Sequence, residues 1–190
     1  MFLSLFETSM PPGLIYVPDW LTDSEHDALI YLIDGSPFDK SLMRRVQHYG
    51  ARYNYESSAV ESVGSAPPIP QEIQIIGERL FSEGFFSRPP EQVIVNEYVG
   101  SQGIAPHIDR TTFGEAVATV SLNESWSMKF RGPNEEISEI LLEKKSLAIM
   151  TQLSRYEWTH EIPKRKYEVM AGMRRLRNRR ISLTFRTIES

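Results

Sequence analysis

The feature that most limits the fold is a series of short strand-like segments in the second half of the chain. They are rich in β-branched and aromatic residues, and turn residues separate them. Many short strands with turns between them are typical of a β-sandwich or a β-barrel. The pattern therefore predicts a mainly β fold beyond Pro90, with strands at residues 92–98, 116–122, 126–130, 146–151, 156–160, 165–170 and 179–188.

Helices are predicted in front of these strands. Thr22 and Glu25 have the spacing of a capping box, and the helix that they begin is expected to end at Gly35. His26 lies on this helix without a metal-ligating partner at a suitable spacing, so we expect it at the surface. The predicted elements of this region are a strand at 14–17 and helices at 22–34 and 71–82, the second with an apolar stripe.

A candidate metal site begins with the spacing His-x-Asp. His107 and Asp109 are two residues apart, so on an extended segment their side chains leave the same face. Asp109 is the only aspartate after Asp39, and a further histidine, His160, follows about fifty residues later. Two imidazoles and one carboxylate suit non-haem Fe(II) that handles dioxygen.

The end of the chain carries a strand with two arginines on one face. From residue 180 to 186 polar and apolar residues alternate, which places Arg180, Ser182, Thr184 and Arg186 together. Two guanidinium groups on one face suit a dicarboxylate. The alternative is a half-buried strand with two exposed arginines.

The segment around Tyr49 combines aromatic and basic residues. Tyr49 and Gly50 predict a turn between two short strands, with Tyr53 and Tyr55 on one face and Arg45 close by. Aromatic faces stack on bases and arginines contact phosphates, so this mixture suits a lid over a nucleotide. The alternative is an ordinary edge hairpin with half-buried tyrosines.

These motifs, in this order, resemble those of the AlkB family of Fe(II)- and 2-oxoglutarate-dependent dioxygenases. The resemblance covers residues 47–187 and rests on Asn-x-Tyr at 96–98, His-x-Asp at 107–109, the distal His160, and Arg-x-Ser-x-Thr-x-Arg at 180–186. It implies Fe(II), 2-oxoglutarate and dioxygen as cofactors. His107, Asp109 and His160 would hold the reactive iron.

The resemblance also assigns the cofactor and substrate pockets. Arg180 with Tyr98 would bind the distal carboxylate of 2-oxoglutarate, and Arg186 with Asn96 the end that chelates the metal. Ser182 and Thr184 would line the same pocket. The residues implied at the substrate are Tyr49, Arg45, Tyr53 and Thr111, where Thr111 stands at a position that is usually acidic in the DNA-repair branch.

The fold class implied is α+β, mainly β: a double-stranded β-helix, or jelly roll, with supporting N-terminal helices. One domain is expected over residues 1–190, with an N-terminal extension at 1–90, a nucleotide-recognition lid at about 44–56 and a catalytic core at 91–188.

Composition excludes several classes of protein. The chain has 190 residues, of which 41% are hydrophobic, and no cysteine, so it has no disulfide framework, zinc knuckle or cysteine nucleophile. No basic leader with a cleavable apolar core begins it, and no apolar run is long enough for a bilayer. We therefore expect a soluble protein of the cytoplasm or nucleus, without a signal peptide or a membrane partner.

A basic stretch at 160–186 contrasts with the formal net charge of −4. Within it, residues 170–178 are expected to form a loop whose arginines contact the phosphates of DNA or RNA. The alternative is that solvated arginines keep the loop soluble.

Several functions are compatible with the motifs. We favour oxidative demethylation of alkylated bases in DNA or RNA, a nucleic-acid repair reaction that releases formaldehyde, succinate and CO2. The segments VQHYG, SQGIAPHID, SRYEWTH and RISLTFR are also similar to the branch that hydroxylates a modified wobble uridine in tRNA. Further alternatives are a protein demethylase and, in another class, a catalytically inactive nucleic-acid-binding module. The choice between DNA and RNA, the preferred base and the oligomeric state stay open.

Overall fold

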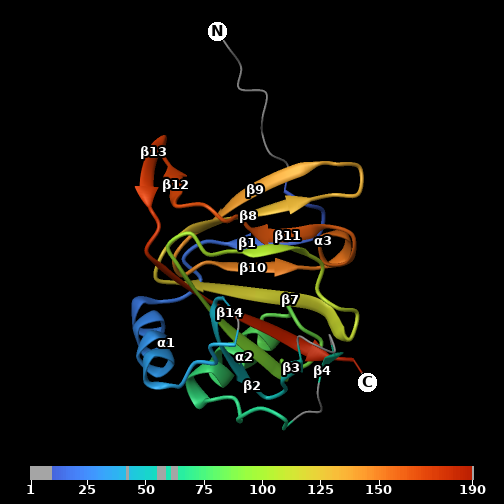
Figure 1. Cartoon of the computed structure of the whole chain (residues 1–190). Coiled ribbons are helices and arrows are strands. Elements are labelled where there is room, and N and C mark those ends of the chain that lie inside the picture. The colour runs from blue at the N-terminus through green and yellow to red at the C-terminus, as the bar shows by residue number, and fades with distance from the viewer. Residues whose placement is uncertain (1–9, 42, 55–58, 61–63, 190) are drawn as a thin grey trace.

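The computed structural model describes residues 10–41, 43–54, 59–60 and 64–189 (Figure 1). Strands dominate it, and the helices are few. In chain order the elements are β1 (Leu14–Val17), α1 (Asp23–Gly35), β2 (Arg45–Tyr49), β3 (Tyr53–Asn54), β4 (Ala59–Val60), α2 (Gln71–Ser82), β5 (Gln92–Val99), β6 (Ile104–His107), β7 (Phe113–Leu122), β8 (Trp126–Arg131), β9 (Ile137–Leu142), β10 (Leu147–Met150), α3 (Gln152–Tyr156), β11 (Thr159–Ile162), β12 (Tyr167–Met170), β13 (Met173–Leu176) and β14 (Arg179–Ile188).

Two antiparallel sheets form the body of the fold. The six-stranded sheet has the order β1-β10-β7-β14-β5-β2, and the four-stranded sheet has the order β6-β11-β8-β9. Small two-stranded sheets, β12-β13 and β3-β4, stand beside them (Figure 1). This arrangement confirms the predicted double-stranded β-helix with helices in the N-terminal half.

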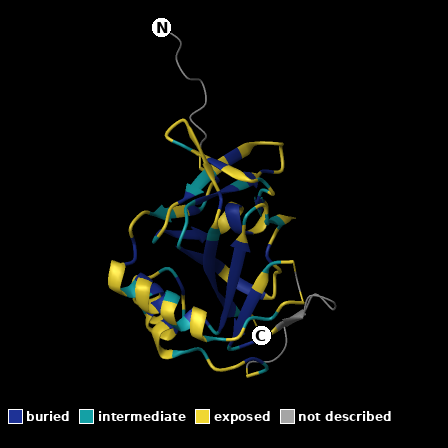
Figure 2. Ribbon diagram, turned by 60° about the vertical axis from the view of Figure 1, so that its left-hand side comes forward, coloured by how far each residue is buried: buried dark blue, intermediate teal, exposed yellow. Residues whose placement is uncertain are grey.

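The two faces of the six-stranded sheet pack against different layers of the fold. One face packs on α1 and α2 and buries a core that includes Leu29, Ile76 and Leu183. The other face looks toward the four-stranded sheet, where Trp126 and Phe130 are buried. Figure 2 shows this burial: the strands in the middle of the molecule are dark blue, and the outer faces of the helices are yellow. The polar side chains of the sheet that face the second layer are therefore the ones that can build a site inside the fold.

Helix α1 confirms the predicted capping box but not the predicted exposure of His26. The Thr22 hydroxyl accepts a hydrogen bond from the Glu25 backbone, and the Glu25 carboxylate accepts one from the Thr22 backbone. His26 is buried, and its Nε2 accepts a hydrogen bond from the backbone N–H of Asn123, 3.3 Å away. The prediction was wrong because the capping box identifies where a helix starts, but not which side of its first turn meets the sheet.

The predicted turn between two short strands is present between β2 and β3, but these strands do not pair with each other, so the alternative of an edge hairpin is wrong. Strand β2 pairs with β5 and forms the edge of the six-stranded sheet, with Tyr49 opposite Val93. The following strand, β3, pairs with β4 instead. The turn at Gly50 is present, and its φ of 78° lies in the left-handed region. Residues 55–58 of the predicted lid, including Tyr55, lie outside the described residues.

Residues 167–176 form a hairpin, where a loop was predicted at 170–178. Strands β12 and β13 pair from Tyr167 with Leu176 to Met170 with Met173.

None of the helices in the described part of the chain has the length and apolar character of a membrane-spanning helix.

Gly50 allows the backbone to approach β5 closely, which predicts a large cost for a side chain there. A Cβ on Gly50 would stand 2.0 Å from the carbonyl oxygen of Glu91, in addition to the strain of its positive φ. We expect Gly50→Ala to lower the free energy of unfolding by about 3 kcal/mol or more. Gly84→Ala is the control, since Gly84 has a similar φ of 82° but no atom within 4 Å of an added Cβ, and should cost about 1 kcal/mol. Urea unfolding measures both, and equal costs would show that the close approach is unimportant.

Candidate metal centre and cofactor pocket

The pairing of two short strands brings the predicted metal ligands together. β6 and β11 run antiparallel, and in their register His107 lies directly opposite His160. The two imidazole rings have centroids 4.3 Å apart, and Asp109 Oδ2 lies 3.7 Å from His160 Nε2. One ligand atom from each of these residues lies within 4.8 Å of the others. This group can hold one metal ion in the facial arrangement that suits Fe(II).

Contacts around the three side chains prepare them for a cation. His107 Nδ1 lies 2.8 Å from the carbonyl oxygen of Ala105, so Nδ1 carries the proton and Nε2 has a free lone pair. Asp109 Oδ1 accepts a hydrogen bond of 2.5 Å from Arg186, while its buried Oδ2 has no hydrogen-bond partner among the described residues. An unpartnered buried carboxylate oxygen beside two imidazoles fits a metal ion.

The electrostatics of the site favour the protonation states that a metal needs. Burial, together with the neighbouring His107, lowers the pKa of His160 to about 3, so its imidazole is neutral near pH 7. Burial is the largest single influence on Asp109 and raises its pKa, but the Arg186 guanidinium together with His160, His107 and Arg155 outweighs burial, and the pKa is about 2. Asp109 is therefore an anion, and His160 a neutral donor, at physiological pH.

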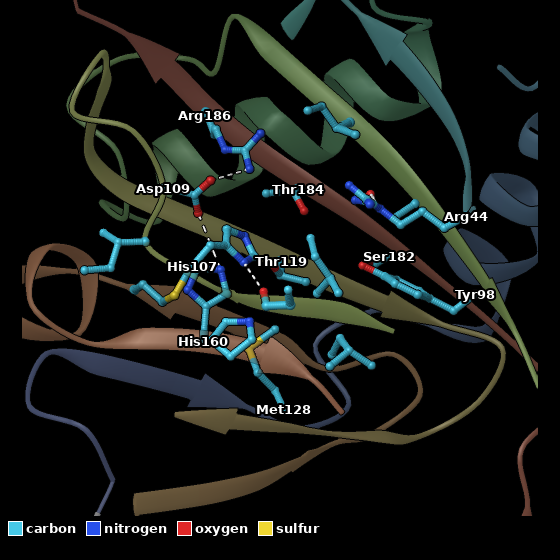
Figure 3. Close-up of a pocket in the computed structure, with 18 of the residues that line it drawn as sticks. Arg44, Tyr98, His107, Asp109, Thr119, Met128, His160, Ser182, Thr184 and Arg186 are labelled. Atoms are coloured by element: carbon cyan, nitrogen blue, oxygen red, sulfur yellow. Dashed lines mark hydrogen bonds and ion pairs between the residues drawn. The ribbon is translucent and has the colours of Figure 1, made fainter. Parts of the chain in front are cut away.

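Next to the three ligands is a cavity of about 440 Å³ between the two large sheets (Figure 3). Alternate residues of β14 line it, as the sequence pattern predicted. The side chains that face it from β14 are Arg180, Ser182, Thr184 and Arg186, and β5 contributes Ile94, Asn96 and Tyr98.

Arg180 gives this cavity an affinity for anions. Its side chain is 1% exposed, donates a hydrogen bond of 2.9 Å to Ser121 Oγ, and makes no ion pair with any described carboxylate. Burial lowers the pKa of its guanidinium to about 10, so it is still a cation at neutral pH. The Tyr98 ring lies beside it, with its centroid 5.7 Å from the guanidinium carbon. A buried cation without a counter-ion fits one carboxylate of a keto diacid whose other end reaches the metal.

The resemblance assigned Arg186 and Asn96 to the end of 2-oxoglutarate that chelates the metal; both residues line the cavity, and each is hydrogen-bonded to another protein group. Arg186 donates to Asp109 and, at 3.1 Å, to Gln92, which is its partner in the register of β14 and β5. Asn96 Oδ1 accepts a hydrogen bond of 2.8 Å from Arg44. Sequence reasoning missed Arg44, which points into the same pocket in Figure 3. Its signal was weak because Arg44 precedes β2, where strand alternation gives no information.

Three of the predicted substrate residues, Tyr49, Arg45 and Thr111, do not line the cavity. Tyr49 is 6% exposed, belongs to the core under α1 and α2, and donates a hydrogen bond to Gln47, so it cannot stack on a base. Arg45 forms an ion pair with Glu97 outside the pocket. Thr111 is exposed in the turn after Asp109 and does not line the cavity. The side chain of Tyr53 lies outside the described residues.

A second residue that sequence reasoning missed, Arg155, holds the backbone next to Asp109. It is fully buried and donates to the carbonyl oxygens of Asp109 at 2.8 Å, of Arg110 at 2.6 Å and of Phe113 at 3.0 Å. These bonds position the metal-ligating carboxylate from α3, a helix that the sequence did not predict.

Comparisons with known proteins agree with this geometry. A model of the 2OG-Fe(II) oxygenase superfamily matches residues 13–186. The mouse tRNA (carboxymethyluridine(34)-5-O)-methyltransferase ALKBH8 is 32% identical over 171 residues, which are 85% of this chain and 26% of that protein. The Alkylated DNA repair protein ALKBH8 homolog of Arabidopsis thaliana is 29% identical over 204 aligned residues, which are 94% of this chain and 59% of that protein. The chain thus spans about a quarter of the length of the mouse relative.

A solved structure, that of OsALKBH1, superposes with a TM-score of 0.72 at 18% identity and covers 94% of this chain and 100% of that one. At this identity it supports the fold alone. The ligand cluster, the family model and the fold lead to one conclusion: the chain belongs to the 2OG-Fe(II) oxygenase superfamily and is an AlkB-like dioxygenase, with Fe(II), 2-oxoglutarate and dioxygen as its cofactors.

Proposed function

We propose that this dioxygenase hydroxylates a modified uridine in tRNA. The observation that carries the proposal is the charge of the cavity: four arginines line it, and Asp109 is the only acidic residue among the described residues that face it. The arginines are Arg44, Arg110, Arg180 and Arg186. Arg180 would bind the keto acid and Arg186 is paired with Asp109, so Arg44 and Arg110 are the two whose charge would act on a substrate.

This charge selects among nucleobases. Adenine and cytosine alkylated on a ring nitrogen are cations, and their amino groups need a hydrogen-bond acceptor in the pocket wall. The arginine side chains offer donors only, and Thr111 provides no carboxylate at the position after the metal site. A uracil ring offers carbonyl oxygens as acceptors, and an acidic substituent on it would be attracted to the guanidinium groups. The cavity therefore suits a uracil better than a cationic lesion.

The names of the relatives support the same substrate class. The mouse relative is named for a carboxymethyluridine at position 34 of tRNA. Oxidative demethylation, which the sequence favoured, becomes the second candidate, and the Arabidopsis relative, named as an alkylated DNA repair protein, keeps it open.

The chain's own residues supply positioning in either reaction. Bound Fe(II) and 2-oxoglutarate supply the oxidation, in which dioxygen converts the keto acid to succinate and CO2 and a nearby C–H bond gains an oxygen atom. Arg180 would orient the keto acid, and the apolar side chains of Ile104, Met128 and Ile162 would exclude water from the reacting carbon.

Product analysis distinguishes the two candidates. The protein is incubated with Fe(II), 2-oxoglutarate and either tRNA with a carboxymethylated wobble uridine or methylated oligonucleotides. We expect a tRNA nucleoside heavier by one oxygen atom, formed together with succinate. Formaldehyde release from the oligonucleotides, with unchanged tRNA, would instead establish demethylation.

Replacing Arg44 should weaken the use of the nucleic-acid substrate more than the binding of 2-oxoglutarate. We expect Arg44→Met to lower kcat/KM for the modified tRNA by about tenfold or more, because a charge-assisted hydrogen bond to the base is removed. The KM for 2-oxoglutarate should stay within about twofold. The matched control is Arg45→Met, since the neighbouring Arg45 pairs with Glu97 outside the pocket. Equal losses in both variants would contradict the assignment of Arg44.

A further inference from the structure

The β12–β13 hairpin stands apart from the two main sheets (Figure 1). Its strands pair only with each other, and Ala171 and Gly172 in its turn both have positive φ, at 49° and 76°. Such a turn matches the twist of a two-residue hairpin. The segment is therefore a two-stranded hairpin outside the main sheets.

One face of the hairpin exposes apolar side chains next to a cation. Alternation along the strands and their pairing place Tyr167, Val169, Arg174 and Leu176 on the same face. Tyr167 is 41% exposed, Val169 64% and Leu176 59%. The guanidinium carbon of Arg174 lies 4.4 Å from the centre of the Tyr167 ring. This aromatic ring and this planar cation offer a stacking platform that is open to solvent.

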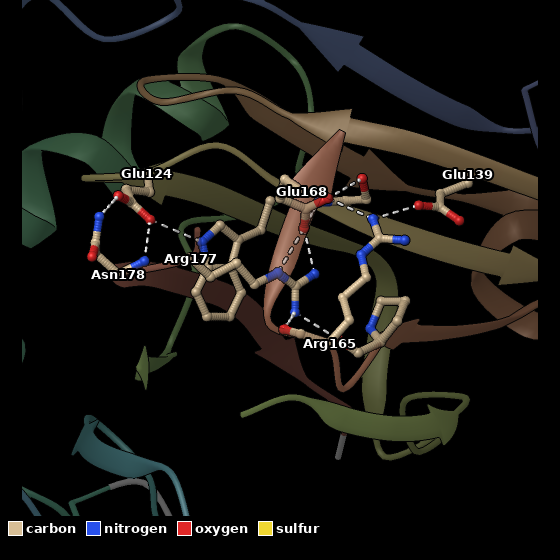
Figure 4. Close-up of polar contacts among 9 residues, drawn as sticks. Glu124, Glu139, Arg165, Glu168, Arg177 and Asn178 are labelled. Carbon is tan, nitrogen blue, oxygen red and sulfur yellow. Dashed lines mark hydrogen bonds and ion pairs between the residues drawn. The ribbon is translucent and has the colours of Figure 1, made fainter. Parts of the chain in front are cut away.

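The base of the hairpin is fixed by a buried ion pair (Figure 4). Glu168 accepts hydrogen bonds from Arg177, from Arg165 at 2.5 Å, and from the backbone and hydroxyl of Ser127, each at 3.0 Å. The Arg177 guanidinium also lies 4.2 Å from the Trp126 ring centre and donates to the carbonyl oxygen of Pro163 at 2.6 Å. These contacts anchor the hairpin on β8 and hold its exposed face in a defined orientation.

The hairpin and the segment before it carry positive charge that this network does not neutralise. Residues 164–176 contain five cations and one acid, Glu168, in a chain of net charge −4. Arg165 and the buried Glu168 are paired with each other. The remaining cations are exposed and make no ion pair with described residues: Lys164, Lys166, Arg174 and Arg175.

This basic segment begins at the rim of the cofactor cavity. The side chain of Lys164 packs against Gly103, where an added Cβ would lie 3.2 Å from Lys164 Cγ and 2.2 Å from the carbonyl oxygen of Ile162. Ile162 and Ile104, the neighbour of Gly103, both line the cavity. A nucleic-acid strand whose target base enters the cavity thus passes close to Lys164.

We infer that the β12–β13 hairpin is a docking surface for the single-stranded RNA that flanks the target nucleotide. Tyr167 with Arg174 stacks on a base. Arg174 and Lys164 contact phosphates, and Arg175, which alternation places on the opposite face, contacts a phosphate across the free edge of β13. Stacking on aromatic and guanidinium planes, combined with exposed cations, is how proteins bind unpaired nucleotides. The inference rests on the proposed function for its choice of RNA, but it concerns binding and not turnover.

Binding is measured by fluorescence anisotropy of a labelled oligouridylate and the full chain, without Fe(II) or 2-oxoglutarate, at several salt concentrations. The double variant Arg174→Ala/Arg175→Ala should bind about tenfold more weakly. Its log–log salt slope should be shallower by about 1.4, or about 0.7 for each single-strand phosphate that is no longer neutralised. Tyr167→Ala should reduce affinity by about tenfold, whereas Tyr167→Phe, which keeps the ring, should bind as the unmodified protein does.

A matched control removes the same charge elsewhere. Arg131→Ala/Lys144→Ala takes two exposed cations from β8 and from the turn after β9, and it should leave affinity and slope nearly unchanged. Thermal unfolding should be the same for all these variants because the side chains are exposed. Should a hairpin variant unfold, photocrosslinking of 4-thiouridine RNA to the unmodified protein decides, with adducts expected within residues 164–176.

The outcomes separate this inference from the proposed function. Three results would overturn the docking surface, even if tRNA uridine is oxidised. The first is an unchanged RNA affinity and salt slope in the hairpin variants. The others are crosslinks only outside residues 164–176 and an unmodified chain that binds no RNA. Loss of RNA binding in the hairpin variants would support it, even if the oxidised nucleoside proves to be a different one.

Discussion

Replacing Asp109 with alanine will abolish turnover and weaken metal binding. Asp109 supplies the only carboxylate of the three-residue ligand cluster, and its Oδ1 is held by Arg186 at 2.5 Å. Changing a residue that merely supports a metal ligand typically lowers metal affinity or activity by about 10- to 100-fold. Loss of the ligand itself should therefore lower them by more than about 100-fold. Succinate formation measures turnover, and titration with Co(II), followed by its visible absorption, measures metal binding.

The control for Asp109→Ala is Glu97→Ala. Glu97 is also a buried carboxylate between arginines, since it pairs with Arg45 and with Arg179, but it lies outside the cavity. Each variant leaves one arginine without its counter-ion, Arg186 for Asp109→Ala and Arg45 for Glu97→Ala, and should lower the melting temperature. Only Asp109→Ala should lose Co(II). Near-normal turnover by Asp109→Ala would refute the metal assignment, and loss of Co(II) by both would mean that the effect is one of stability.

The parts of the fold that were predicted from the sequence depend on short-range patterns. Alternation over residues 180–186 correctly divides β14 into a cavity face and a core face, because one side chain in two points each way on any strand. The ligand types of His107, Asp109 and His160 are informative for a similar reason, since few side chains suit Fe(II). Their convergence needed only the pairing of β6 with β11.

The predictions that were wrong or missing depend on which surfaces of the helices and strands pack against each other. Alternation could not tell that the face of β2 with Tyr49 lies under the helices, so an aromatic core residue was taken for a base-stacking one. Arg155 and Arg44 act across 46 and 52 residues of sequence, through contacts that no local pattern contains. Strand β13 is exposed at all four positions, so it shows no hydrophobic alternation from which to predict it.

Replacing Arg180 with methionine will remove most of the response to 2-oxoglutarate without destabilising the protein. The Arg180 guanidinium is buried and is in no ion pair with a described residue, so its loss leaves no carboxylate unpaired. Each charge-assisted hydrogen bond to the keto acid contributes about 1.5–3 kcal/mol, and we expect the KM for 2-oxoglutarate to rise by about 100-fold. The dissociation constant for RNA should change by less than about twofold. Equal effects on both would mean that the keto acid binds elsewhere.

Arg177 provides the matched comparison, because it is also a buried arginine of the same region but is paired with Glu168. With ligand at about one hundred times its dissociation constant, the unmodified protein should gain about 2.7 kcal/mol, a rise in melting temperature of roughly 5–10 °C. Arg177→Met should melt lower, since Glu168 loses its buried partner, yet should keep this rise. Without ligand, Arg180→Met should melt no lower than the unmodified protein does, and at the same ligand concentration its melting temperature should rise by only about 1–2 °C, because its affinity is about 100-fold lower. The contrast separates a cation held for structure from one held for a ligand, and a full rise retained by Arg180→Met would exclude its role in binding the keto acid.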